Sequence, residues 1–224
     1  MELQNPLYKN IGAHAIINLF TVEKGTIKVL LIKRSNEPYN NMWALVSGAL
    51  YNNELIVDGA LRELKEKSGI TNVNLELFKI FDKIDRSPLL RMYGFAFIGV
   101  VDSSIISFLK TTKKTNDADW FSLENIPSLA YDHHEILNEA IVTLRKMIVN
   151  SDILKSLFPN GFTIPEIHKV YESILDIKID RRNFRKKLIS FDFVKDTNKM
   201  VNFKGRKPAK LYMFSKDLKN ETLF

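Results

Sequence analysis

The first 150 residues of the chain alternate apolar runs of the β type with segments of helical periodicity. The runs that predict strands lie at residues 14–20, 28–32, 43–46, 75–84, 91–101 and 119–123. An apolar stripe at helical spacing follows the third run and consists of Val57, Ala60, Leu61 and Leu64. Asn52 or Asn53 could cap that helix, and Asp132 is well placed to cap a second helix further on. This alternation predicts a domain that combines a sheet with helices.

The pattern changes after residue 150. Residues Thr163 to Glu166 form a capping box with proline in the first helical turn. Asp180 then caps a second helix, in which Phe184 and Leu188 face inward. Two short strand-like runs follow, at residues 191–194 and 210–214. Two helices followed by a hairpin predict a winged helix-turn-helix, so we divide the chain into domains at residues 1–150 and 151–224.

The charge distribution separates the same two segments. The chain has 33 Lys+Arg and 26 Asp+Glu, a net charge of +7. Residues 1–150 hold 17 of each, so the whole excess lies in residues 151–224, with 16 basic and 9 acidic side chains. Such asymmetry suggests a module that meets a polyanion, although a merely soluble basic surface is the alternative.

Cysteine usage and hydropathy exclude several classes of protein. There is no cysteine, which excludes disulfides and thiolate metal sites. No apolar run approaches the length of a membrane span, and the N-terminus lacks a signal-peptide pattern. A cytoplasmic location without membrane contact is therefore the default expectation.

The predicted winged helix places its basic residues where such modules meet DNA. The second helix of this motif enters the major groove, and the wing lies along the backbone. These side chains would neutralise phosphates, and arginine could also read guanine edges. The candidate DNA-binding residues are Arg181, Arg182, Asn183, Arg185, Lys186, Arg206 and Lys207. The alternative is a solvated basic helix and hairpin that only stabilise the fold.

Candidate chemistry lies between Gly48 and Ile70, where a glycine-bearing loop runs into the first helix. Glu63 and Glu66 are three residues apart and share one helical face with Lys67. Carboxylates on one face suit a hard cation such as Mg²⁺, which takes oxygen ligands and commonly a substrate phosphate. Lys67 would pair with Glu63 and in part replace that cation.

The spacing of Gly48, Glu54, Arg62-Glu63, Glu66 and Gly69-Ile70 resembles the Nudix box of hydrolases that cleave nucleoside diphosphates linked to another group. The resemblance implies an α+β fold, an α/β/α sandwich with a mixed sheet. Two positions depart from the family: Lys67 stands where the family has a metal-binding glutamate, and Ser47 precedes Gly48 where the family has paired glycines. We therefore expect a vestigial catalytic site and weak metal binding by Glu63 and Glu66. No cofactor would be required, and Mg²⁺ would matter only if hydrolysis were retained.

Four further stretches resemble the Nudix-related transcriptional regulators. They are the turn Asp85-Arg86-Ser87-Pro88, the Asp132-His133 pair before a helix, and the C-terminal runs 180–185 and 205–212. The resemblance implies a homodimer that binds near-palindromic double-stranded DNA and responds to ADP-ribose, a related nucleotide or a sugar. The candidate ligand-binding residues are Arg34, Gly48, Arg86 and Arg91. His133 and His134 are adjacent and point in different directions, so no zinc site is expected there.

Two rival interpretations remain open. An active Nudix pyrophosphohydrolase would use Glu63 and Glu66 with a carboxylate from elsewhere, such as Asp117 or Asp119, to hold Mg²⁺ and orient water. Lys67 and the basic module argue against that enzyme. A third interpretation is an RNA-binding or scaffold protein that uses the basic module without sequence specificity.

Overall fold

The computed structural model describes residues 11–23, 25–102, 109–150, 153–190, 193–201 and 207–215, with the side chains of 149 and 150 left aside. The chain forms two compact units. The first unit comprises Met1–Phe20, Val29–Gly99 and Ile106–Ala140. The second comprises Thr21–Lys28, Val100–Ile105 and Ile141–Phe224.

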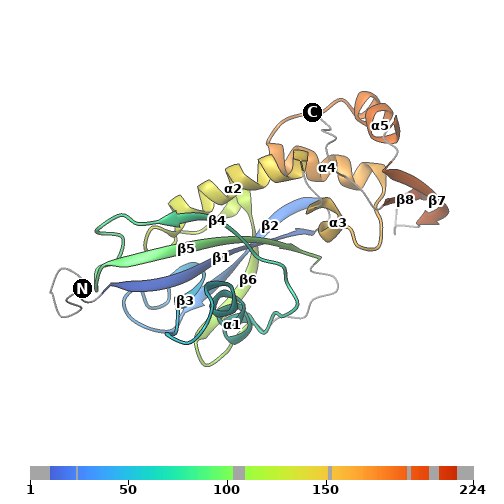
Figure 1. The fold of residues 1–224 in the computed structure, drawn as a ribbon. Coiled ribbons are helices and arrows are strands. Elements are labelled where there is room, and N and C mark those ends of the chain that lie inside the picture. The colour runs from blue at the N-terminus through green and yellow to red at the C-terminus, as the bar shows by residue number, and fades with distance from the viewer. Residues whose placement is uncertain are drawn as a thin grey trace. The chain divides into compact units, whose positions relative to one another are not determined.

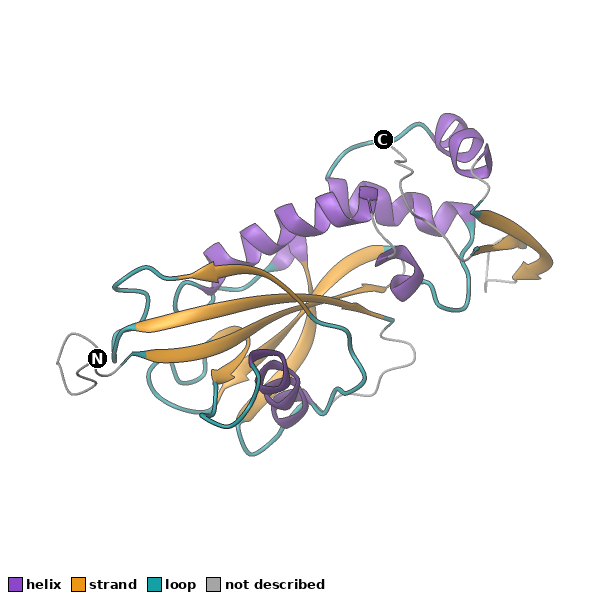
Figure 2. Ribbon diagram, in the orientation of Figure 1, coloured by secondary structure: helices purple, strands orange, loops and turns teal. Residues whose placement is uncertain are grey.

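Six strands form one sheet in the order β4-β5-β1-β3-β2-β6 (Figure 1). Their bounds are β1 Gly12–Glu23, β2 Thr26–Arg34, β3 Trp43–Ala49, β4 Glu76–Phe81, β5 Met92–Val101 and β6 Thr115–Ser122. Strand β3 pairs antiparallel with both β1 and β2, which places Gly48 opposite Ala15. Helices α1 (Ile56–Ser68) and α2 (His133–Asn150) lie on opposite sides of the sheet (Figure 2). The loop after Gly48 therefore delivers α1 to one face of the sheet.

The central strands are buried over continuous runs of mostly apolar residues rather than on alternate residues. Residues 15–17, 19 and 20 of β1 and residues 29–32 of β2 are all buried. Continuous burial is what a strand covered on both faces requires. The two helices supply that cover, with Ala60 and Leu64 of α1 and Leu137 of α2 buried.

Helix α1 begins differently from the sequence prediction. Its N-cap is Leu55, which has an extended backbone and no side-chain cap, so the expected cap at Asn52 or Asn53 was wrong. Glu54 closes the loop instead, because its Oε1 accepts a hydrogen bond from the Tyr51 N–H at 2.7 Å. At the other end Gly69 adopts φ 75°, a left-handed C-cap that glycine tolerates at no steric cost.

Some predicted strands are shifted. The expected strand at 75–84 is limited to β4, and the one at 119–123 begins earlier, at Thr115. The early part of β6 is polar and pairs through its backbone, which hydrophobic periodicity does not report. Asp132 directly precedes α2, and its carbonyl accepts the Ile136 N–H at 3.1 Å. Its carboxylate, however, binds Arg86 rather than the helix terminus.

The C-terminal unit has the predicted two helices and hairpin, and one further short helix precedes them. Its elements are α3 Ile153–Leu157, α4 Ile164–Leu175, α5 Arg181–Ser190, β7 Val194–Val201 and β8 Ala209–Phe214. The capping box of α4 is confirmed, with the Thr163 N–H donating to Glu166 Oε2 at 3.4 Å. Asp180 Oδ1 accepts the Asn183 N–H at 2.9 Å, which confirms the cap of α5.

The core of this unit is aromatic. Phe184 and Leu188 of α5 are buried as predicted, and the Phe184 ring lies edge-on to Tyr171 of α4 at 5.4 Å. The hairpin pairs Val194 with Phe214 and Val201 with Ala209. Residues 191 and 192 of the predicted strand at 191–194 lie outside the described residues, and the paired segment begins at Val194, where that prediction ended. None of the helices among the described residues combines the length and apolar character needed to cross a bilayer.

Candidate functional site

Arg62 binds two acidic residues of the Nudix box, Glu54 before α1 and Glu63 within it. Its Nε and Nη2 donate to the two oxygens of Glu54 at 2.8 and 2.7 Å, and its Nη1 donates to Glu63 Oε1 at 2.5 Å. The hydrogen bonds from Arg62 lower the pKa of the Glu54 carboxyl to about 2. Nη2 also donates to the Ala49 carbonyl at 2.8 Å, which ties the helix to the end of β3. Arg62 therefore keeps the Glu54 carboxylate ionised.

Lys67 reaches into the same group from the next helical turn. Its side chain is 13% exposed, its Nζ donates to the Ser47 carbonyl, and the same Nζ lies 3.3 Å from Glu63 Oε2. The predicted pairing of Lys67 with Glu63 is therefore present. Burial lowers the pKa of the Lys67 ammonium, while the Glu63 charge opposes that shift. Lys67 thus occupies the space between β3 and the box carboxylate.

Lys114 completes the group and was not anticipated from the sequence. It lies just before β6, and its Nζ is 2.5 Å from Glu66 Oε2. The hydrogen bond from Lys114 is the main cause of the lowered pKa of the Glu66 carboxyl. The two residues are 48 positions apart, and no local pattern signals such a contact.

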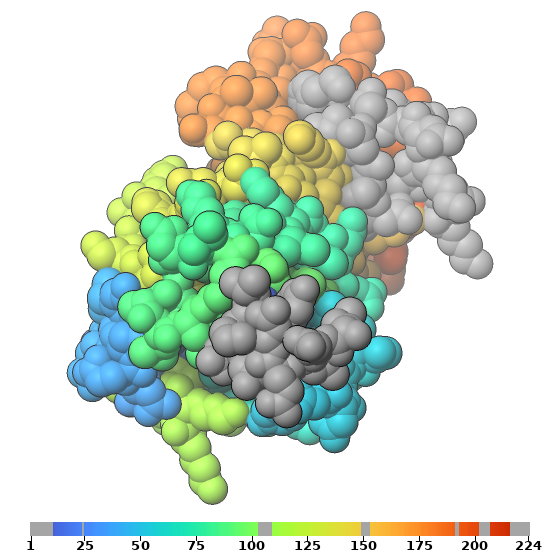
Figure 3. Space-filling view, turned by 60° about the vertical axis from the view of Figure 1, so that its left-hand side comes forward, coloured from blue at the N-terminus to red at the C-terminus, as the bar shows by residue number. Residues whose placement is uncertain are grey.

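Two cavities of about 330 and 270 Å³ open beside this group. Both are lined by Arg34, Asn36, Gly48, Ala49 and Lys67. Two surface segments border the larger cavity, one after β2 and one between β4 and β5. They are blue and green in Figure 3, where they adjoin one another. The shared lining makes the cavities two parts of one cleft, which we call the box cleft.

Gly48 must be glycine for the box cleft to keep its shape. A Cβ at this position would lie between 2.0 and 2.4 Å from the carboxylate atoms of Glu63. The absence of a side chain lets β3 approach α1 closely enough for Lys67 to reach Ser47. The strand and the helix therefore present their polar groups to one space.

Three of the four predicted ligand-binding residues line the box cleft, namely Arg34, Gly48 and Arg86. The Arg34 guanidinium lies over the Tyr131 ring at 5.0 Å, and its Nε donates to the Pro38 carbonyl at 3.0 Å. Arg86 binds both oxygens of Asp132 at 2.9 Å. The fourth residue, Arg91, is outside the described lining, and its guanidinium lies 5.1 Å from the Tyr93 ring centroid.

Two histidines also line the cleft, and both are held neutral. Burial is the largest cause that lowers the pKa of His133 to about 3 and that of His14 to about 4. His133 Nδ1 accepts a hydrogen bond from the Leu45 N–H of β3 at 3.1 Å, so its lone pair is already occupied. Sequence reasoning did not select His14, and a lone half-buried histidine gives no signal that could have singled it out.

The carboxylates needed by the rival hydrolase are not brought to the cleft. Asp117 Oδ1 accepts the Ala118 N–H at 2.9 Å, and Asp119 Oδ1 accepts the Trp120 N–H at 2.8 Å. Neither residue is among the described lining of the two cavities. Among the described residues, no group of three His, Asp or Glu side chains is arranged to hold a metal ion. Glu63 and Glu66 are instead paired with side-chain cations.

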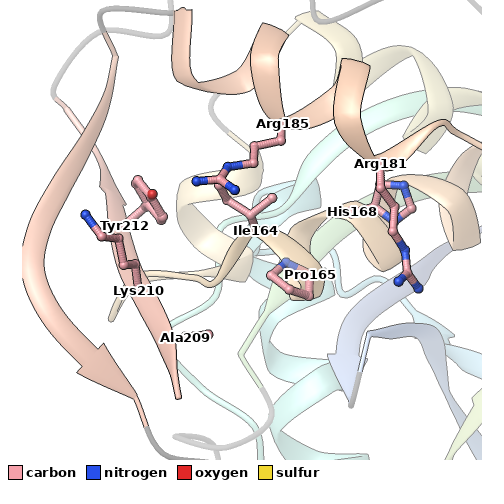
Figure 4. Close-up of a pocket in the computed structure, with 8 residues that line it drawn as sticks. All are labelled: Ile164, Pro165, His168, Arg181, Arg185, Ala209, Lys210 and Tyr212. Atoms are coloured by element: carbon pink, nitrogen blue, oxygen red, sulfur yellow. The ribbon is translucent and has the colours of Figure 1, made fainter. Parts of the chain in front are cut away.

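A third cavity, of about 290 Å³, lies within the C-terminal unit (Figure 4). Its basic residues are Arg181 and Arg185 of α5 and Lys210 of β8, and its floor is formed by Ile164 and Pro165 at the start of α4. In Figure 4 Arg185 extends from α5 into the space between β8 and Ile164. The cavity therefore combines an apolar floor with cationic walls.

The remaining predicted DNA-binding residues lie on other parts of this surface. Arg182, Asn183 and Lys186 of α5 are exposed on the side away from the buried Phe184 and Leu188. Lys207 is exposed just before β8. Arg206, the other wing-tip candidate, lies outside the described residues. Helix α5 thus presents basic side chains both to solvent and to the cavity beside the wing.

An α/β sandwich with a Gly-Glu-Arg-Glu box, joined to a basic winged helix, defines a class of two-domain proteins with a nucleotide-type cleft. The chain belongs to the Nudix family, because the NUDIX domain model matches residues 12–141. A model described as the NrtR DNA-binding winged helix domain matches residues 144–214. The two matches give the domain order of the Nudix-related transcriptional regulators. They meet within α2, whereas our predicted boundary falls at the end of that helix, at residue 150.

Proteins similar to this chain include two curated proteins and the solved structure of a DNA complex. The ADPR responsive transcriptional repressor NtrR of Acinetobacter baylyi is 29% identical over 201 residues, which is 88% of this chain and 79% of that protein. The ADP-ribose pyrophosphatase of Methanocaldococcus jannaschii is 33% identical over 112 residues, or 50% of this chain and 64% of that protein. The crystal structure of Shewanella oneidensis NrtR complexed with a 27mer DNA has a TM-score of 0.72 at 24% identity and covers 91% of this chain and 93% of that one. The last match confirms the predicted fold class.

Proposed function

We propose that this protein is a DNA-binding transcriptional regulator whose Nudix domain binds ADP-ribose or a related nucleotide or sugar metabolite without efficient hydrolysis. The observation that carries the proposal is Lys67, whose largely enclosed ammonium lies 3.3 Å from the box carboxylate Glu63, in a chain that also has a basic winged helix. An ammonium there opposes the metal that pyrophosphate cleavage uses, while the cleft around it remains open. A pocket that binds without turnover is what a sensor requires.

ADP-ribose is the leading effector for two reasons. The names of both curated relatives contain this ligand, one as a repressor and one as an enzyme. The box cleft also offers Arg34, Lys67 and Lys114 beside Tyr131, which suits a diphosphate next to a planar or sugar group. A sugar effector without phosphate would leave these cations with little to bind.

Operator binding is assigned to α5 and the wing. The Shewanella relative crystallised with DNA supports this assignment, as does the excess of +7 that lies wholly in residues 151–224. We propose a homodimer in the cytoplasm on a near-palindromic operator, because a two-fold dimer presents the same helix twice at a fixed spacing. Effector binding would change DNA affinity only through its different affinity for the DNA-bound and free conformations.

The test uses the full-length protein in two assays. In the first, ADP-ribose is incubated with Mg²⁺, and we expect turnover close to the uncatalysed background. In the second, fluorescence anisotropy follows retention of DNA fragments from upstream of the protein's own gene. We expect sequence-selective, salt-sensitive retention that ADP-ribose alters. Rapid hydrolysis together with indifference to every DNA fragment would overturn the proposal.

The alternative, an active Nudix hydrolase with an accessory C-terminal domain, is favoured by the similarity to the Methanocaldococcus pyrophosphatase. The two assays separate it from the regulator, because an enzyme would turn over ADP-ribose whether or not DNA is present. Retention of any nucleic acid with the same affinity would instead indicate the third option, a non-specific RNA-binding or scaffold protein.

A further inference from the structure

We infer that the box cleft holds its anionic ligand with built-in ammonium groups, Lys67 and Lys114, and does not use Mg²⁺. The inference deepens the proposed function, because it takes ADP-ribose as the effector. The Nudix family implies a divalent cation at this place, and the residues present do not fit one. Three observations carry this conclusion: the charge of the box, the engagement of its oxygens and the lining of the smaller cavity.

The box is electrically complete without a metal. It holds three carboxylates, of Glu54, Glu63 and Glu66, and three cations that pair with them. The cations are Arg62, Lys67 and Lys114. A glutamate at position 67 would leave the same cluster with a net charge of −2, which is the charge that one divalent ion neutralises. The lysine therefore replaces both the missing ligand and the ion.

Five of the six oxygens of these carboxylates already have a cationic partner. Both oxygens of Glu54 are bound by Arg62, and Glu66 Oε2 is bound by Lys114 at 2.5 Å. Glu63 is the most buried of the three, and Arg62 binds its Oε1. Its Oε2 is buried without a hydrogen bond, and the Lys67 ammonium lies 3.3 Å from it as an ion-pair partner. Mg²⁺ requires close, near-octahedral oxygen contacts and gives up its waters reluctantly. To approach Glu63 it would have to displace a buried ammonium that also binds the Ser47 carbonyl.

The same ammonium groups face the ligand space. The smaller cavity is lined by three cationic side chains, Arg34, Lys67 and Lys114, and by one carboxylate, Glu63. Lys67 is anchored on two sides, whereas the Lys114 side chain is 43% exposed and lies within reach of solvent. Ammonium and guanidinium groups donate to phosphate oxygens directly. A diphosphate can therefore be bound by this chain's own side chains.

The first experiment measures metal binding to the ligand-free, full-length protein. Mn²⁺ is titrated and the free ion is counted by electron paramagnetic resonance. We expect no saturable Mn²⁺ binding at the box by the wild type, and one new site in Lys67→Glu. Lys65→Glu is the matched control, because it makes the same charge change on an exposed residue of the same helix and should bind no Mn²⁺. Saturable binding by the wild type that Glu63→Gln removes would overturn the inference.

The second experiment measures ADP-ribose affinity by calorimetry in EDTA and again with Mg²⁺. We expect the two dissociation constants to agree within about twofold, since one tenfold change corresponds to about 1.4 kcal/mol of metal contribution. Lys67→Gln and Lys114→Gln should each weaken binding at least about tenfold in both buffers. Lys113→Gln, an exposed neighbour, is the control for Lys114 and should bind like the wild type. Circular dichroism and a melting curve establish that each variant is folded.

The two experiments separate failure of the inference from failure of the proposed function. Binding of ADP-ribose that requires Mg²⁺ would overturn the inference and leave the effector assignment intact. Absence of ADP-ribose binding in both buffers would overturn the effector, and the Mn²⁺ titration would then decide the metal question alone. Unchanged affinity in Lys67→Gln and Lys114→Gln would remove these side chains from the site.

Discussion

His133 is a buried histidine of the Nudix domain, and its hydrogen bond requires the imidazole to stay neutral. It is 3% exposed, and its Nδ1 must stay unprotonated to accept the Leu45 N–H. Burial lowers its pKa to about 3, below the ordinary value of 6.5. The unfolded chain therefore binds a proton at higher pH than the folded chain does. The stability that results is fully present above the unfolded pKa and is lost as the pH falls toward the folded pKa.

We therefore predict that His133→Asn flattens the acid limb of the stability curve. The asparagine oxygen can accept the same hydrogen bond without titrating. Between about pH 7.5 and about pH 5 the wild type should lose roughly 2 kcal/mol more unfolding free energy than the variant, which urea denaturation would measure. The exposed His134→Asn is the control and should follow the wild-type curve. Parallel curves for wild type and His133→Asn would contradict the assignment of a neutral, hydrogen-bonded histidine.

Two ion pairs connect the segment after β4 with the start of α2, and only one is buried. Arg86 binds Asp132 through two bonds of 2.9 Å, with side-chain exposures of 4% and 13%. Lys83 binds Glu135 at 2.6 Å, with exposures of 62% and 46%. Breaking a buried pair leaves an uncompensated charge, whereas solvent screens an exposed pair.

Arg86→Ala should therefore destabilise the protein by about 3 kcal/mol and Lys83→Ala by less than about 1 kcal/mol in chemical denaturation. Arg86 was selected from the sequence as a ligand contact, and it does line the box cleft. Its bond to Asp132 gives it a structural role as well. If the two variants lost the same unfolding free energy, the Arg86–Asp132 pair would stabilise the protein no more than the exposed Lys83–Glu135 pair does.

At the scale of elements, local rules succeed where the partner lies within one helical turn. Thr163 with Glu166 and Asp180 with Asn183 cap their helices as predicted, because each contact spans three residues. The cap predicted for α1 was wrong. Glu54 accepts a hydrogen bond from Tyr51 and binds Arg62 eight residues later, and the N-cap is Leu55. Capping preferences alone do not predict an ion pair with a residue eight positions away, and here that ion pair determines where the helix begins.

The Asp180 cap gives a prediction for the basic helix. Asp180→Ala removes the acceptor for the Asn183 N–H at the terminus of α5 and should cost about 1 kcal/mol. Asp180→Asn removes the charge but keeps the acceptor, so its stability should stay close to that of the wild type. Thermal melts give the stability, and anisotropy gives the DNA affinity. We expect Asp180→Ala to weaken DNA binding even though it removes a negative charge. Tighter binding by both variants would show that charge rather than helix order controls α5.

Across the whole molecule, the contacts that create the box cleft join distant parts of the chain. Lys114 and Glu66 are 48 residues apart, and His133 and Leu45 are 88 apart. The sequence could predict the box, the Lys67–Glu63 pair and the winged helix, because those depend on spacing within one element or on net charge. It could not predict that β6 brings a third cation to the box, because that contact depends on strand order. Hydrophobic periodicity indicates which face of a strand is buried, but it does not indicate which strand lies next to it in the sheet.

Linkage between the two domains supplies the last prediction. If ADP-ribose and DNA favour different conformations, one coupling free energy describes both effects, and each ligand must change the affinity of the other by the same factor. We expect ADP-ribose to weaken the DNA affinity by about 5–150-fold, which corresponds to about 1–3 kcal/mol. Saturating DNA should then raise the dissociation constant of ADP-ribose by the same factor, measured by calorimetry on the preformed complex. Lys67→Gln should lose the response to ADP-ribose while its DNA affinity without effector stays at the wild-type level, because Lys67 lies in the first unit and α5 in the second. A Lys67→Gln variant that binds ADP-ribose weakly yet keeps the full wild-type response of DNA binding to ADP-ribose would show that the box cleft is not the place where the signal is received.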